Sequence, residues 1–153
     1  MNTKQKVVSV ICMCMSILLT FNASATENDM SEIAGIWLTE EDDAKVEVFQ
    51  KGGRIYGNII WSKKIESGEE SGFDVNNPDE ELRERKIIGL QILSDFEKTG
   101  DTKWENGKIY DPESGNTYSC VIKLDRKKQT LKVRGYMGIA LIGRTTTWKR
   151  FTE

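Results

Sequence analysis

The sequence lacks histidine and has little proline or cysteine. Its 153 residues include two prolines and three cysteines, beside 22 basic and 24 acidic side chains. The absence of histidine excludes Ser-His-Asp triads, histidine-ligated zinc sites and imidazole proton shuttles. A formal net charge of −2 argues against a nucleic-acid-binding surface, which is normally basic. The length fits one domain.

The first 25 residues have the pattern of a cleavable secretory signal peptide. Lys4 and Lys6 precede an apolar stretch over 7–21, and an Ala-x-Ala cleavage site ends at Ala25. A membrane anchor is the alternative, but this stretch is shorter than the roughly 20 residues that cross a bilayer. We therefore predict an exported protein, periplasmic or secreted, with one domain over 26–153 and no membrane-spanning segment after cleavage.

Cleavage would change both the charge and the cysteine count. Residues 1–25 contain two lysines and no acid, so 20 basic and 24 acidic side chains would remain, a net charge of −4. Cys120 would be the one remaining cysteine, which excludes an internal disulfide. Because Cys120 shares a strand face with apolar neighbours, we expect a buried, inert thiol rather than a reactive one.

Apolar and polar residues alternate along most of the remaining chain, which is typical of half-buried β-strands. Gly52-Gly53 and Asn106-Gly107 favour two-residue hairpins between them. Sequential hairpins favour a small, closed, antiparallel up-and-down β-barrel of the lipocalin type, with a two-sheet β-sandwich as the alternative. The pattern predicts eight or nine strands: 34–39, 44–51, 54–62, 88–96, 102–106, 108–111, 116–125 and 129–150, the last broken near Gly138.

One segment, 63–86, is long, charged and without this alternation. Asn77 and Pro78 are typical of a helix start, and Glu80 would complete a capping box. We predict a short helix over 78–85 within a charged loop. Long loops in compact domains are often lids over a site or are disordered, and the sequence does not decide between these roles.

The first strand opens with Gly35-Ile36-Trp37. A G-x-W followed by a β-meander resembles the first-strand signature of lipocalin-type barrels. The resemblance implies that Trp37 closes one end of the barrel and that an arginine from a late strand, Arg144 or Arg150, packs on its ring. The other end would then be an open calyx. The alternative is a filled barrel in which Trp37 is ordinary core.

More motifs follow: G-N-I-I-W over 57–61, D-x-x-N-P-D over 74–79, I-Y-D-P-x-x-G-x-x-Y over 109–118, V-R-G-Y over 133–136 and W-x-R over 148–150. In this order, over about residues 33–150, they resemble the bacterial exported family known as domain of unknown function 2147. The resemblance implies a signal-bearing β-barrel and brings no established activity, substrate or cofactor. Arg85-Lys86 stands where the family usually has Arg-Pro, which implies a looser turn there.

Most motif residues have an architectural interpretation. Asp111 can accept backbone N–H bonds in a turn, Pro112 fixes φ, and Gly115 supplies a positive φ. A catalytic or cation-binding role for Asp111 is the alternative. Gly135 permits a bend or a close backbone approach. The other structural candidates are Gly35, Trp61, Trp148 and Arg150.

Four residues are candidates for ligand binding: Trp37, Arg134, Tyr136 and Arg144. Arg134 and Tyr136 share a strand face opposite Val133. If that face lines a cavity, arginine and tyrosine suit an anionic or amphipathic ligand. If it faces solvent, these side chains pair with surface acids.

The sequence therefore favours a noncatalytic envelope barrel that binds a small molecule and needs neither cofactor nor metal. An interaction module that uses the acidic 63–86 segment, with an unidentified protein partner, is the alternative. A hydrolase using paired carboxylates is the third hypothesis, because no G-x-S-x-G motif and no metal-ligand cluster is present in the sequence.

Overall fold

The chain folds into a closed, antiparallel barrel in which each strand pairs with its neighbours in the sequence, and β1 pairs with β8. The computed structural model describes residues 32–139 and 142–152, and the predicted signal peptide lies outside the described residues. The strands are β1 (Gly35–Leu38), β2 (Ala44–Lys51), β3 (Arg54–Ser62), β4 (Gln91–Gly100), β5 (Lys103–Asp111), β6 (Asn116–Asp125), β7 (Thr130–Tyr136) and β8 (Gly143–Arg150). The up-and-down barrel prediction is confirmed and the β-sandwich alternative is wrong.

The strand count is eight because 102–106 and 108–111 are one strand, β5, and not a hairpin. Asn106-Gly107 forms a bulge instead of a turn, with a register shift between Trp104 and Gly107 and a φ of 61° at Asn106. The ring of Phe96 packs directly on Gly107, where a Cβ atom would lie 2.3 Å from it. Asn106-Gly107 therefore makes room for the Phe96 ring within a continuous strand and does not reverse the chain.

The connection between β3 and β4, residues 63–90, is here called the strap. It contains a short helix, α2 (Lys63–Glu66), and a single turn of 3-10 helix, η1 (Glu80–Leu82). The predicted helix over 78–85 is thus wrong in length and in its cap, because Asp79 and not Asn77 accepts the Glu81 N–H. Asn77 instead accepts the N–H of Asp79 and belongs to a buried network described below.

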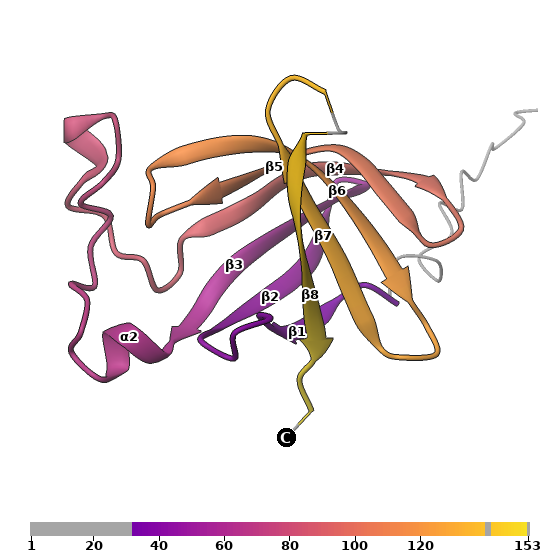
Figure 1. Ribbon diagram of the computed structural model, residues 1–153, viewed down its shortest axis with the longest axis horizontal. Helices are drawn as coiled ribbons and strands as arrows, with labels where there is room; N and C mark the ends of the chain where they lie inside the picture. The colour runs from indigo at the N-terminus through magenta and orange to yellow at the C-terminus, as the bar shows by residue number, and fades with distance from the viewer. Residues whose placement is uncertain (1–31, 140–141, 153) are drawn as a thin grey trace, which may run out of the picture.

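The barrel has two different ends. At one end, here called the mouth, lie the connections 39–43, the strap, 112–115 and the described part of the β7–β8 connection, residues 137–139 and 142. At the other, the closed end, lie residues 32–34 and the turns 52–53, 101–102 and 126–129. Figure 1 shows the strap and the β5–β6 turn on one side of the barrel, with the β4–β5 and β6–β7 turns on the opposite side.

The core fills the closed half of the barrel. Every second side chain along each strand points into the barrel, and in this half most of these side chains are apolar and buried. The largest of them are Trp37, Phe96 and Trp104, with no exposed surface.

Candidate functional site

The mouth of the barrel opens into a cavity of about 1160 Å³. Its inner wall is made by inward-facing residues of β2 to β8, most of them apolar: Val46, Ile59, Ile92, Ile109, Tyr118, Val133, Gly135, Thr146 and Trp148. Period-two alternation places them there, because every second side chain of a barrel strand points inward. A cavity of this size and lining can accept a small apolar molecule or the apolar part of an amphiphile.

Charged and half-exposed residues surround the cavity entrance. The β1–β2 loop contributes Glu40, Glu41 and Asp43, while the strap contributes Lys64 and Glu70. The entrance also has exposed apolar side chains, Phe73 and Val75 on the strap and Met137 and Ile142 in the β7–β8 loop. An apolar interior with a mixed, charged entrance is the arrangement that an amphipathic ligand requires.

The closed end is sealed by the residues that precede β1. Arg150 lies over the Trp37 ring, 4.2 Å from its centroid, and donates to the backbone oxygens of Glu32 and Ala34. Trp37 donates its indole N–H to the Ile33 oxygen at 2.9 Å, and Ile33 is fully buried. The arginine on the tryptophan is thus Arg150 and not Arg144. Gly35 has a φ of 131°, and a Cβ there would lie 2.8 Å from the Arg150 guanidinium.

The four predicted ligand-binding residues lie in three different places. Trp37 belongs to the closed end and does not contact the cavity. Arg134 lies on the outer face of β7 and donates to the Thr145 hydroxyl at 2.8 Å. Tyr136 and Arg144 line the mouth, where Arg144 is 80% exposed and 3.5 Å from the Glu41 carboxylate. Two of the four residues therefore reach the cavity.

A buried polar network fastens the strap to the barrel. Asp74 is fully buried, and its carboxylate accepts bonds from Tyr110 at 2.7 Å, Asn77 at 2.8 Å and Arg85 at 2.7 Å. Burial alone would raise the pKa of Asp74, but these hydrogen bonds and the Arg85 charge outweigh it and hold the pKa below its ordinary value. Burial and the Asp74 bond raise the pKa of Tyr110.

The strap also hydrogen-bonds to the β5–β6 turn. Asn76 donates to the backbone oxygens of Pro112 and Glu113. Gly115 has a φ of 71°, and a Cβ atom there would lie 2.0 Å from the Asn76 oxygen. The Asp111 carboxylate accepts from the Glu113 N–H and the Ser114 hydroxyl, so it is engaged within the turn itself. These residues hold the strap at the edge of the cavity.

The remaining structural candidates support the barrel wall. Trp61 donates to the Glu66 carboxylate at 3.0 Å and lies under the Lys45 ammonium. Trp148 is buried at the cavity floor. A Cβ on Gly135 would touch Ile109 at 3.4 Å, so the glycine keeps β7 close to that side chain.

Cys120 is buried on β6, facing the core, with 1% of its surface exposed. Desolvation raises the pKa of its thiol to about 12. The thiol is therefore protonated at neutral pH and is a poor nucleophile.

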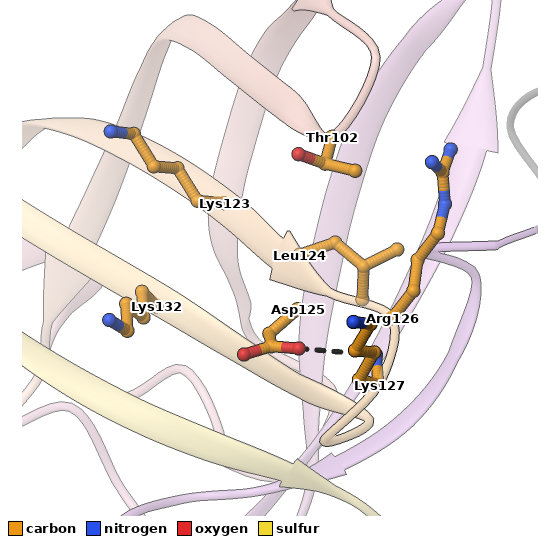
Figure 2. Close-up of a pocket in the computed structure, with 7 residues that line it drawn as sticks. All are labelled: Thr102, Lys123, Leu124, Asp125, Arg126, Lys127 and Lys132. Atoms are coloured by element: carbon orange, nitrogen blue, oxygen red, sulfur yellow. Dashed lines mark hydrogen bonds between the residues drawn. The ribbon is translucent and has the colours of Figure 1, made fainter.

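A second, shallower cleft of about 390 Å³ lies at the closed end. Figure 2 shows Lys123 and Lys132 extending from adjacent strands, β6 and β7, with Arg126 and Lys127 in the turn below. Lys123 and Lys132 stand directly opposite each other in the register. The lining of this cleft has four basic side chains and one acid, Asp125, in contrast to the mouth.

Two classes of site have no counterpart in the described residues. Over 32–139 and 142–152, there is no group of three or more cysteine or carboxylate side chains that could hold a metal ion. In the same part of the chain, no helix has the length and the apolar composition to cross a membrane.

Comparison with known proteins now gives the family. The model of the bacterial family described as "Uncharacterized protein conserved in bacteria (DUF2147)" matches residues 35–150. The chain belongs to the DUF2147 family. The resemblance expected from the sequence motifs is thus confirmed, and the matched range extends from the start of β1 to the end of β8.

A solved structure has a similar fold. It is described as "Protein HP1028 from the human pathogen Helicobacter pylori belongs to the lipocalin family", and its TM-score to this DUF2147 chain is 0.70. The two chains are 30% identical over 78% of this chain and 83% of the Helicobacter protein. No curated protein matches the chain. The lipocalin-like barrel is therefore shown both by the topology and by this neighbour.

The sequence does not predict the Asp74 network, although Asp74, Asn77 and Tyr110 stand in two of the motifs that carry the DUF2147 resemblance. The D-x-x-N and I-Y-D-P motifs are 36 residues apart when measured from Asp74 to Tyr110. The alternation of apolar and polar residues predicts strands, but it does not predict that the strap packs against the β5–β6 turn. The one hint in the sequence is that an acid and an amide, Asp74 and Asn77, stand three residues apart in the charged segment 63–86.

Proposed function

We propose that this protein is a noncatalytic barrel of the bacterial cell envelope, and that it binds a small amphipathic molecule with the apolar part inside the barrel. The observation that carries the proposal is the cavity of about 1160 Å³ with an apolar inner wall that opens at the mouth. The lipocalin-like fold supports it, because such barrels can enclose a small ligand. Envelope location rests on the signal-peptide pattern of residues 1–25.

Binding inside the barrel can be tested with N-phenyl-1-naphthylamine, a neutral apolar probe that fluoresces in apolar surroundings. Thr146 faces the cavity from β8, so Thr146→Trp should place an indole in the apolar part of the cavity and weaken probe binding about tenfold or more. Thr147 is the next residue on the same strand and faces outward, so Thr147→Trp is the matched control. Equal weakening in both variants, or no binding by the wild-type protein, would contradict the proposal.

A second candidate function is an interaction module on the strap. Leu82 and Ile88 are exposed on the strap, at 39% and 41%, and neither lines the cavity. Cross-linking in cells should then give a discrete partner band that the double variant Leu82→Ser, Ile88→Ser loses. A band that survives these substitutions would exclude this surface as the contact.

A further inference from the structure

The lining of the cavity carries an excess of acidic groups, all of them near the mouth. It includes six carboxylates, Glu40, Glu41, Asp43, Glu70, Asp111 and Glu113, but only two basic side chains, Lys64 and Arg144, which gives a net charge of −4. That charge equals the formal net charge of residues 26–153, with 20 basic and 24 acidic side chains. The acid excess of the whole domain is thus matched by the excess at this one opening.

Both basic groups of the lining already face carboxylates. The Lys64 ammonium contacts Glu113 and lies 3.2 Å from Glu70, and bonds to these two acids raise the pKa of Lys64. Arg144 is paired with Glu41 at 3.5 Å. An anionic head group would therefore compete with a carboxylate at Lys64 or Arg144, whereas a cationic head group meets carboxylates in excess.

The inner wall leaves the head group no alternative position. Below the mouth the lining residues are uncharged, and their polar groups are hydroxyls such as those of Tyr118 and Thr146. A charge placed in this apolar interior would lose its hydration without gaining a counter-ion. The charged part of a ligand therefore has to remain at the mouth, within the field of its carboxylates.

We propose that the cavity selects amphiphiles with a cationic head group, an amine or quaternary ammonium on an apolar body, over anionic ones of the same size. The inference rests on the proposed function, because it requires a ligand in the cavity. The opposite pole of the barrel supports it. Figure 2 shows Lys123, Lys127 and Lys132 around the closed-end cleft beside one carboxylate, Asp125, so the charge excess there is opposite in sign to that at the mouth.

The test compares three ligands with the same tail, each used below its micelle concentration: decyltrimethylammonium, decyl maltoside and decyl sulfate. Each displaces N-phenyl-1-naphthylamine from the wild-type protein. At low ionic strength we expect decyltrimethylammonium to bind about tenfold more tightly than decyl sulfate, with decyl maltoside between them. The ratio should shrink as salt is added, because the mouth carboxylates are solvent-exposed and screened.

Two double variants that lose the same charge test whether the preference for a cationic head group comes from the mouth. Glu40→Gln with Glu41→Gln removes two mouth carboxylates and should reduce the cation-to-anion ratio severalfold. Glu47→Gln with Glu84→Gln removes the same charge from exposed positions away from the cavity and should leave the ratio unchanged. An equal fall in both double variants would show that net charge, not the mouth, sets the preference, and would overturn the inference.

The outcomes separate this inference from the proposed function. Tighter binding of decyl sulfate, or equal binding of all three ligands, would overturn the head-group selection while leaving a ligand-binding barrel in place. Failure of all three ligands, with no probe binding to displace, would instead overturn the proposed function. Tightest binding of decyltrimethylammonium, with sensitivity at Glu40 and Glu41 alone, would support both.

Discussion

The two halves of the barrel use the same strand alternation but differ in the size of their inward side chains. In the closed half, Trp37, Phe96 and Trp104 belong to one buried core cluster and have no exposed surface. In the open half, valine, isoleucine, threonine and glycine occupy most inward positions beside Tyr118 and Trp148, and about 1160 Å³ is left unfilled. The difference shows that a barrel of eight strands is wide enough to be either a core or a container, and that side-chain volume decides which.

The halves also differ in how their ends are finished. The closed end is sealed from within the barrel by Arg150 and the residues before β1. The mouth is bordered by the strap, which reaches the barrel wall through the polar network around Asp74. The contacts over Trp37 are made by a guanidinium, an indole and backbone oxygens, whereas the strap is fastened through one carboxylate, Asp74, so its attachment depends on pH. Stability should therefore reside in the closed half and adjustability in the open half.

The largest expected effect is on the closed half. Trp37→Ala removes a fully buried indole and the platform for Arg150. The free energy of unfolding should fall by about 3–5 kcal/mol, the usual cost of truncating a buried tryptophan. Urea unfolding followed by circular dichroism measures it. A loss below about 1 kcal/mol would show that the closed end is not the stabilising half.

The next effect is on the strap. Asp74→Asn removes the negative charge opposite Arg85, which is 35% exposed and can partly regain water. We expect a local cost of about 1–3 kcal/mol, seen as faster hydrogen exchange over 72–90 while the closed half keeps its protection. Glu80→Gln is the control, because Glu80 pairs with Arg83 on the surface. Uniform loss of protection over the whole barrel would contradict a separate strap.

The same network predicts the direction of a pH effect. The pKa of Asp74 is below its ordinary value in the folded protein, so its stabilising contribution is complete above the ordinary pKa and is lost as the pH falls through the folded value. Strap exchange, corrected for the intrinsic pH dependence, should therefore rise in acid. In Asp74→Asn this rise should be absent, and its persistence there would assign the effect to other groups.

The sequence was sufficient for the barrel because alternation and turns are local signals. It was not sufficient for β5 or for the strap, because contacts with residues far away in the sequence determine the conformation there. Asn106-Gly107 has the composition of a hairpin turn, yet the ring of Phe96 fills the space over Gly107 and the strand continues. Asn77 has the composition of a helix cap, yet it bonds to Asp74 and Tyr110.

The candidate site shows the same limit. Alternation correctly separates Arg134 from the inward face of Val133, but it cannot say which inward positions are left without a facing partner. That depends on the volumes contributed by other strands, such as Phe96 in one half and Ile92 in the other. The charge at the mouth is likewise assembled from three separate connections and from the ends of β5 and β8, so no single stretch of sequence displays it.

The smallest expected effect comes from making the same substitution, isoleucine to alanine, once in each half of the barrel and comparing the loss in free energy of unfolding. Ile122 is fully buried in the closed half, whereas Ile109 is half-buried and borders the cavity. Ile122→Ala leaves a void among packed neighbours and should cost about 2–5 kcal/mol, whereas Ile109→Ala only enlarges an existing space and should cost about 1 kcal/mol or less. Both are measured by urea unfolding. Equal costs would mean that the open half is packed as tightly as the closed half in solution. A small cost at Ile109 together with altered binding of N-phenyl-1-naphthylamine would show that this side chain has a larger role in the ligand site than in the core.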